Sequence, residues 1–328
     1  MAPLWKAISV QYVRDDADAK VYQGVVDSDW TIGSVPNGGY VLALILQACI
    51  EHQSSTSHRD PIHVTAHYLR TTSKTAFEVR IKALKTGKGF TNLTAELVQE
   101  DQLKVVTHII FGSFASTEPA HAKLKAALSP PSRFARKVPL YRHPSNAPPM
   151  PMRKAWGFHR HSRWTEEPEV HTANQAMNAE VGGGGLEWGS WFELTDKDER
   201  ITTASLAFLV DMFVNTPMIL SKISDVGLPI SWFPTMTLAI EFKHPIPQSE
   251  AFAKRTVGLY SSGKYLNDPS GHHDIYAEVW TAPCNIGEGQ EQAGWRDNQR
   301  CLAVATQMAL VVPFEVNTKS GEKSAARL

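Results

Sequence analysis

The sequence predicts an α+β protein made of two similar halves, each with one buried helix and an antiparallel sheet. Three observations support this prediction: two apolar segments of helical length, a series of strand-like segments after each of them, and a proline-rich segment between the two series. The chain has 328 residues, of which 42% are hydrophobic. That length suits about two domains, and the composition allows a sizeable core.

In the first half, residues 40–50 are apolar on nearly every face, which is typical of a buried helix. A strand is expected before this helix, at residues 20–25. Leu93, Ala95 and Leu97 alternate with polar residues and therefore share one face of a strand. The strands expected after the helix are residues 63–70, 77–84, 90–99 and 103–112.

The second half repeats this order. We expect a strand at residues 186–194 and then one helix from about residue 203 to residue 220. Residues 63–70 align with residues 237–244, which indicates an internal duplication at a period far longer than a solenoid repeat. The strands expected after the second helix are residues 235–243, 251–261, 274–281 and 302–312.

Between the halves, the proline density disfavours long helices and central strands, so this segment is predicted to be a linker on the surface. The polar residues that end the chain are expected to be solvated. The predicted organisation is an N-terminal unit at residues 1–115, the linker at 116–180, a C-terminal unit at 181–316 and a polar tail at 317–328.

One long apolar helix and five antiparallel strands pack economically when the sheet wraps around the helix and buries it. This arrangement is the hotdog fold. Two tandem βαββββ units in one chain predict a double hotdog, whose two sheets can join edge to edge.

Composition and motifs exclude several classes of protein. Lys and Arg together number 33, as do Asp and Glu, which argues against a general nucleic-acid binder. Three widely spaced cysteines predict neither a disulfide framework nor a zinc site, and they fit a reducing compartment. Residues 40–50 are too short to span a bilayer, so no membrane association is expected. The sequence contains no G-x-S-x-G elbow and no complete nucleotide-binding motif.

The last three residues, Ala326, Arg327 and Leu328, form a small-basic-Leu tripeptide of the S-K-L type. Such tripeptides are read by the peroxisomal import receptor, which would then be a partner. A chance match is the alternative. The predicted location is therefore the peroxisome or the cytoplasm.

Several segments together resemble the thioesterase-like superfamily, in particular the acyl-CoA thioesterase II (TesB-type) double hotdogs. They are residues 30–40 and 64–70 in the first half and residues 234–242 and 303–307 in the second. The resemblance implies hydrolysis of acyl-CoA, or of a related acyl thioester, to a carboxylic acid and a free thiol. It implies no cofactor and no metal, with coenzyme A only as part of the substrate, and it allows a homo-oligomer.

Asn37, Gly38 and Gly39 precede the first apolar helix, whose N-terminus would present unpaired N–H groups and a positive dipole end. Such a site can polarise a thioester carbonyl and stabilise the oxyanion formed on attack. The alternative is that the two glycines only allow close packing. Lys88, with Lys85 and Arg70, is a candidate for contacts with coenzyme A phosphates.

The resemblance implies a site in which an Asp, a Thr or Ser, and a Gln position a water molecule. Gln307 matches the Gln, and the hydroxyl is placed at Ser261, within residues 260–262. The Asp position is assigned to Thr237, whose hydroxyl cannot act as a base at neutral pH. Asp211, in the second apolar helix, is a replacement carboxylate, since a buried charge there needs a partner or a function. The other replacement carboxylate is Glu241, on the same strand face as Thr237.

Loss of the family Asp would also suit a non-hydrolytic enzyme that performs cyclisation, dehydration or acyl transfer in a biosynthetic pathway. His63 and His67 share a strand face and are candidate bases for dehydration, although structural roles are favoured for both. A non-catalytic acyl-binding protein is the third alternative.

Overall fold

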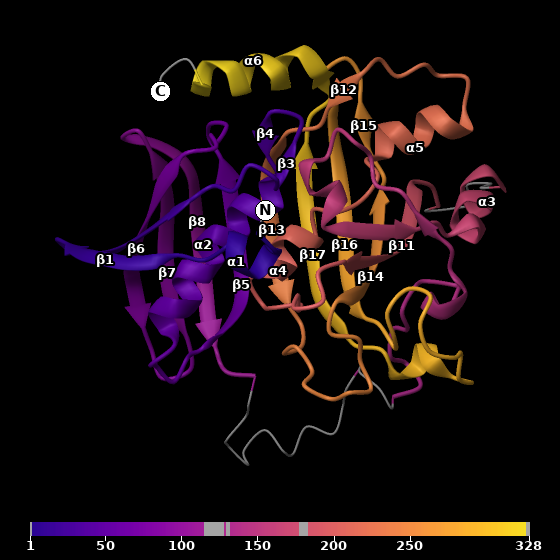
Figure 1. Ribbon diagram of the computed structural model, residues 1–328, viewed down its shortest axis with the longest axis horizontal. Helices are drawn as coiled ribbons and strands as arrows, with labels where there is room; N and C mark the ends of the chain where they lie inside the picture. The colour runs from indigo at the N-terminus through magenta and orange to yellow at the C-terminus, as the bar shows by residue number, and fades with distance from the viewer. Residues whose placement is uncertain (1, 115–127, 129–131, 177–182, 326–328) are drawn as a thin grey trace.

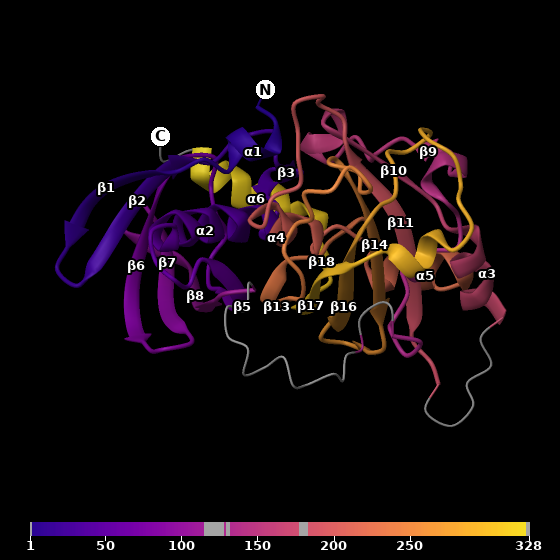
Figure 2. The same cartoon turned by 90° about the horizontal axis from the view of Figure 1, so that it is seen from below.

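The computed structural model describes residues 2–114, 128, 132–176 and 183–325. Its main feature is a 14-stranded sheet in which neighbouring strands are antiparallel. Figures 1 and 2 show the sheet curling around a central helix in each half. The tripeptide predicted to be an import signal lies outside the described residues. No helix in the described ranges combines the length and the apolar character needed to cross a membrane.

The N-terminal half of the sheet has the order β1-β2-β6-β7-β8-β5. Its strands are β1 (Gln11–Asp16), β2 (Ala19–Val25), β5 (Asp60–Tyr68), β6 (Ala76–Thr86), β7 (Thr91–Gln99) and β8 (Gln102–Gly112). The C-terminal half continues as β13-β17-β16-β14-β11-β10-β9, with β15 paired to β16. These strands are β9 (Pro149–Met150), β10 (Ser162–Thr165), β11 (Leu186–Leu194), β13 (Thr235–Phe242), β14 (Thr256–Gly263), β15 (Leu266–Asn267), β16 (His272–Thr281) and β17 (Cys301–Ala309).

The two halves meet edge to edge where β5 pairs with β13. The strand order β2-β6-β7-β8-β5 on one side corresponds to β11-β14-β16-β17-β13 on the other. Thr237 pairs with His67 and Glu241 pairs with His63, as expected for two related strands arranged about a twofold axis. The predicted double hotdog and its edge-to-edge joining are therefore confirmed.

The helix of the N-terminal half, α2 (Gly38–Gln53), is buried along most of its length. Its N-cap is Asn37, whose side-chain Oδ1 accepts a hydrogen bond from the Tyr40 N–H at 2.9 Å. The apolar pattern of residues 40–50 therefore predicted the helix, and the cap fixes its first turn.

The single helix predicted at residues 203–220 is wrong. The chain forms α4 (Ser205–Leu209), leaves the helical path, and then forms α5 (Thr216–Ile223). Pro217 gives the physical reason, because its ring would clash with the carbonyl four residues earlier in a continuous helix. Asp211 lies in the break between the two helices.

Much of the predicted linker belongs to the C-terminal half. β10 pairs with β11, and the short β9 extends the edge of the sheet, where proline is tolerated. Phe158 and Trp164 are buried in the main core. The remaining elements of this segment are the 3₁₀ helices η2 (Pro144–Asn146) and η3 (Gly157–Arg160) and the helix α3 (Pro168–Ala176).

The end of the chain is not simply a solvated tail. Helix α6 (Phe314–Ala325) lies across the top of the molecule in Figure 1, against the ribbon of β3 (Thr31–Ile32) and β4 (Val35–Pro36). Asn317 is fully buried, donating to the Ile32 carbonyl and accepting from the Ser34 N–H. A second short ribbon, β12 (Ser231–Trp232) with β18 (Val312–Pro313), leads into α6. The remaining helical elements are α1 (Leu4–Ala7) and η4 (Trp295–Asn298).

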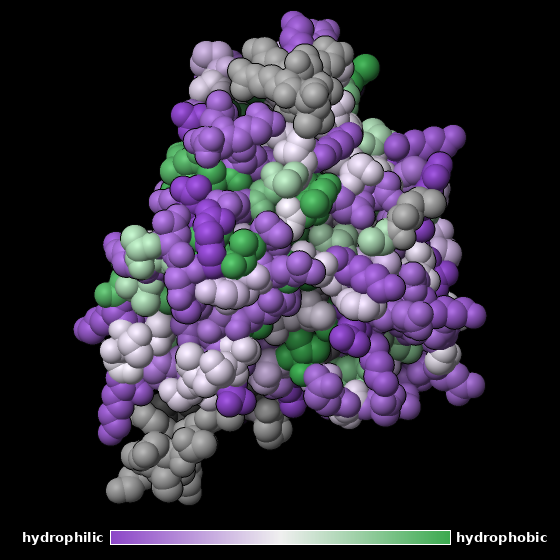
Figure 3. Space-filling model, turned by 60° about the vertical axis from the view of Figure 1, so that its left-hand side comes forward, coloured by the Kyte–Doolittle hydropathy of each residue, from purple (hydrophilic) through white to green (hydrophobic). Residues whose placement is uncertain are grey.

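The face shown in Figure 3 is predominantly hydrophilic, with hydrophobic side chains in small separate patches. Such scattered patches are ordinary for a folded protein. This face therefore shows no extended apolar patch that would bind a hydrophobic ligand.

Candidate active site

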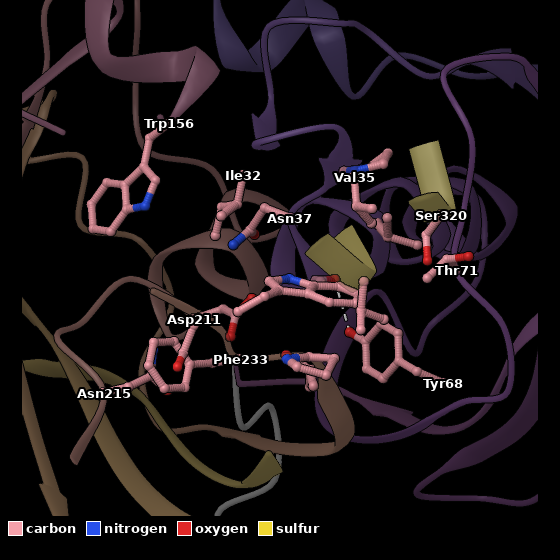
Figure 4. A pocket seen from close by; sticks show the side chains of 18 of the residues that line it. Ile32, Val35, Asn37, Tyr68, Thr71, Trp156, Asp211, Asn215, Phe233 and Ser320 are labelled. Atoms are coloured by element: carbon pink, nitrogen blue, oxygen red, sulfur yellow. Dashed lines mark hydrogen bonds between the residues drawn. The ribbon is translucent and has the colours of Figure 1, made fainter. Parts of the chain in front are cut away.

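A cavity of about 480 Å³ is lined by residues from both halves of the protein. From the N-terminal half, the cavity is lined by the start of α2, the end of β5 and the β3–β4 ribbon. From the C-terminal half, it is lined by the break that follows α4 and by residues of β13, β17 and α6. Most of the lining is apolar, including Val41, Met212, Phe213 and Trp232. In Figure 4, Asn37, Tyr68 and Asp211 surround one region of this cavity.

Asp211 is the carboxylate of the cavity, and it lies at the N-terminus of α2. Its Oδ2 accepts a hydrogen bond from the Gly39 N–H at 2.7 Å. Burial raises the pKa of Asp211 to about 6, although hydrogen bonds from Gly39 and from the side chains of Gln307, Asn37 and Thr235 lower it. The carboxylate is therefore mostly ionised at neutral pH and can accept a proton.

Gln307 and Thr235 form a second polar pair beside Asp211. The Gln307 Nε2 donates to the Thr235 Oγ1 at 2.7 Å, which fixes the orientation of the amide. The Gln307 Oε1 is buried and has no hydrogen-bond partner among the described residues. An acceptor of this kind is suited to a water or substrate hydrogen, because a buried polar atom is normally paired.

Tyr68 supports the first turn of α2 from the neighbouring strand. Its hydroxyl donates to the Gly38 carbonyl at 2.8 Å. Burial, followed by the nearby charge of Asp211, raises the pKa of Tyr68 well above its usual value, so the hydroxyl stays protonated. Tyr68 is therefore a hydrogen-bond donor that holds the turn in place.

The two glycines at the start of α2 have different surroundings. Gly39 lies so close to α4 that a Cβ there would be 2.4 Å from the Ala207 carbonyl oxygen, and its N–H is donated to Asp211. Gly38 lines the cavity, and its N–H has no acceptor in the described part of the chain. Close packing therefore explains Gly39, whereas Gly38 offers the open donor.

Three other residues predicted for the site lie elsewhere. Ser261 is on β14, opposite Trp188 and Ala277. Lys88 is exposed on the turn between β6 and β7, where its carbonyl contacts His58. Neither these two residues nor Thr237 lines the cavity.

A β-bulge explains why Thr235, and not Thr237, reaches Gln307. The pairing of β13 with β17 shifts register between Thr235 and Thr237, so these residues oppose the consecutive residues Ala309 and Met308. In a regular strand, residues 235 and 237 would lie on the same face of the sheet. Here they lie opposite consecutive residues of β17, whose side chains point to opposite faces, so Thr235 and Thr237 also point to opposite faces. Thr237, which was assigned to the family Asp position, therefore lies outside the cavity, whereas Asp211, the replacement carboxylate expected from the sequence, lines it.

The remaining candidates from the sequence have ordinary structural surroundings. Glu241 is exposed and forms an ion pair with Lys243. His63 and His67 lie outside the cavity. The described residues contain no cluster of three or more His, Cys, Asp or Glu side chains that could hold a metal ion.

This architecture and site define a double hotdog protein, and comparison with known families specifies it further. A model of the acyl-CoA thioesterase N-terminal domain matches residues 26–112, and a model of the acyl-CoA thioesterase C-terminal domain matches residues 144–283. The chain therefore belongs to the acyl-CoA thioesterase family. The second match begins within the segment predicted to be a linker, in agreement with the strands found there.

Solved structures with the same fold cover nearly the whole chain. A putative thioesterase II from Thermobifida fusca is 20% identical over 95% of this chain and 98% of its own, with a TM-score of 0.67. A hotdog-fold protein of unknown function from Alicyclobacillus acidocaldarius is 15% identical over 94% and 97%, with a TM-score of 0.64. An acyl-CoA thioesterase II from Mycobacterium marinum is 12% identical over 94% and 98%, with a TM-score of 0.60.

One curated relative shares a shorter region. The ustilagic acid biosynthesis cluster protein orf2 of Mycosarcoma maydis is 31% identical over 105 residues, which is 31% of this chain. The match spans only 28% of that relative's length.

Proposed function

We propose that this protein hydrolyses an acyl-CoA, or a related acyl thioester, to a carboxylic acid and a free thiol. The observation that carries the proposal is the position of Asp211, which meets the N-terminus of α2 beside Gln307 and Thr235 in a largely apolar cavity. An Asp, a Thr and a Gln are the residue types that the family resemblance implies. The apolar lining supplies space for an acyl chain.

In the proposed reaction, Asp211 accepts a proton from a water molecule held by the Gln307 Oε1. The water oxygen attacks the thioester carbonyl carbon, and the negative charge that develops on the carbonyl oxygen is stabilised by the Gly38 N–H and the dipole of α2. Collapse of the tetrahedral intermediate breaks the C–S bond, and the proton on Asp211 passes to the departing sulfur. A pKa of about 6 suits both steps, since the group must take up and release a proton near neutral pH.

A role in biosynthesis is the second candidate, and the curated relative supports it through its name. The same carboxylate could remove a proton from a hydroxyl of an acceptor molecule instead of from water. The acyl group would then pass to that oxygen, and the thiol would still be released. Hydrolysis and transfer therefore differ in the acyl product and not in the thiol.

The test is thiol release from a panel of short, medium, long and aromatic acyl-CoAs, with the acyl product identified by mass spectrometry. Free acid together with free thiol would support hydrolysis. An ester formed only when an alcohol is added would support transfer. A folded protein that releases no thiol from any substrate, yet gains thermal stability with acyl-CoA, would overturn both and indicate an acyl-binding protein.

A further inference from the structure

One cation in the cavity has no acidic partner among the described residues. Arg153 is half-buried, and its Nη1 lies 3.3 Å from the Met218 sulfur, which is only a weak acceptor. Its guanidinium carbon lies 5.8 Å from the centre of the Trp156 ring. No carboxylate within the described ranges forms an ion pair with it. Arg163 and Arg255, by contrast, both pair with the buried Glu193.

The charge of the cavity lining is also unbalanced. Among the described residues that line it, the cations are Arg70 and Arg153, and Asp211 is the acidic residue. Arg70 is exposed and donates from its Nη1 to the Leu103 carbonyl at 2.9 Å. A half-buried cation without a counter-charge is unfavourable, so a lining with two cations and one carboxylate favours an anionic ligand.

The surroundings of Arg153 also orient it for binding. A guanidinium carries five N–H donors in a planar fork, and the Trp156 ring, within cation–π range of Arg153, takes up none of these donors. The Arg153 Nε and Nη2 have no hydrogen-bond partner in the described residues and are not among their buried unsatisfied atoms, so these two nitrogens are accessible to solvent. Figure 4 shows Trp156, the ring beside Arg153, on the opposite side of the view from Tyr68 and Thr71.

We infer that Arg153 binds an anionic group of the substrate, either a phosphate of the thiol carrier or a carboxylate at the far end of the acyl chain. Both groups offer the paired oxygens that a guanidinium can bind with two parallel hydrogen bonds. The inference rests on the proposed function, because it takes the cavity to be the acyl-thioester site. It adds to that function a feature of the substrate that the cavity would recognise, namely an anionic group apart from the reacting carbonyl.

The inference can be tested by binding alone, with S-alkyl-CoA thioethers of short, medium and long chain length, which cannot be hydrolysed. Titration calorimetry would compare the wild type with Arg153→Met and Arg153→Lys. If the partner is a phosphate, we expect the Kd of these thioethers to rise on the order of ten- to a hundredfold in Arg153→Met, as for loss of a charge-assisted hydrogen bond; if it is the carboxylate, the same rise is expected only for probes whose chain ends in a carboxylate. Arg153→Lys should recover part of the affinity, because it keeps the charge but not the fork.

Arg200→Met is the matched control. The guanidinium carbon of Arg200 lies 5.7 Å from the centre of the Trp5 ring, close to the distance between Arg153 and Trp156, but Arg200 is exposed and lies outside the cavity. Its loss should leave the Kd of the thioethers unchanged. Melting temperatures of all three variants would show whether each is folded.

S-alkyl-pantetheine probes, which lack the nucleotide and its phosphates, would distinguish a phosphate partner of Arg153 from a carboxylate partner. If Arg153→Met weakens CoA thioethers but not these probes, the partner is a phosphate. If it weakens only pantetheine probes whose alkyl chain ends in a carboxylate, the partner is that carboxylate. Equal binding by the wild type and a folded Arg153→Met for every probe, or no binding at all, overturns the inference. Thioether binding that depends on Arg153, without thiol release from any acyl-CoA, would overturn the proposed function alone.

Discussion

The two halves of this protein share one strand order but differ in their central helix. α2 is a continuous helix of 16 residues, whereas its counterpart is divided into α4, of five residues, and α5, of eight. The break between them places Asp211 opposite the first turn of α2, where the Gly39 N–H meets the carboxylate. One half thus contributes a helix N-terminus and the other contributes a carboxylate.

The sheet shows the same difference at related positions. Val64 pairs with Ile109 in the N-terminal half, and its counterpart Leu238 pairs with Gln307 in the C-terminal half. Ile109 is fully buried in the apolar core, while Gln307 faces the cavity with Thr235. The two strands that join the halves, β5 and β13, have bulges at related positions, namely residues 61–63 and residues 235–237. In the described part of the duplicated fold, the candidate site is therefore composite, because the C-terminal half is polar at Thr235 and Gln307 where the N-terminal half has Pro61 and Ile109.

The largest effect is expected from Asp211→Asn, which removes the carboxylate but keeps the size of the side chain. Loss of a general base typically lowers the rate by ~100- to 10,000-fold, and we expect a fall in kcat of about 1,000-fold. Thiol release under saturating acyl-CoA would measure it. Glu241→Gln is the control, since this exposed carboxylate lies outside the cavity and should leave the rate within about twofold.

The melting temperature of Asp211→Asn would show whether its loss of activity is due to unfolding. The folded pKa of Asp211 is about 6, which is above the ordinary value of about 4, so the folded state binds more protons between these pH values. The ionised carboxylate therefore destabilises the fold as pH rises through this range. Asp211→Asn should melt no lower than the wild type at pH 8, and an unchanged kcat in this folded variant would contradict the assigned base.

The next effect comes from exchanging the related positions of the two halves. Gln307→Leu should reduce kcat by about 100-fold by removing the group proposed to hold the water. The loss of stability should be modest, about 1 kcal/mol, because the Oε1 has no partner in the described structure and only the hydrogen bonds made by the Nε2 are lost. Ile109→Gln should instead destabilise the fold by about 2 kcal/mol, because it buries an amide without a partner. Denaturant unfolding and thiol release would measure both. A Gln307→Leu variant with wild-type kcat would show that the halves do not differ in function here.

The smallest effect is the pH dependence of the wild type. Because Asp211 must be ionised to accept a proton and its pKa is about 6, kcat/KM should be about tenfold lower at pH 5 than on the plateau above pH 7. A pH profile of thiol release would show one ionisation on this acid limb. Constant activity down to pH 5 would indicate that another group limits the reaction.

The sequence by itself determined the elements and their repetition. Periodicity placed α2 and the main strands within a few residues, since apolar patterns depend on local burial against a core. The order of these elements was sufficient to predict the double hotdog, because a buried helix needs a sheet around it. Asp211, Gln307 and Asn37 were also proposed from local features, namely a charge in an apolar segment, a family position and a helix entrance.

The tertiary structure alone decided how these residues meet. Gly39 and Asp211 are 172 positions apart in the sequence and come together only because the two sheets join through β5 and β13. Thr235 replaces Thr237 at the site because of one extra residue in the strand pairing, and strand alternation does not reveal such a bulge. The position of Arg153, which has no acidic partner in the described structure, depends on contacts between distant segments in the same way. Local patterns record which residues are buried, whereas long-range pairing determines which buried residues face one another.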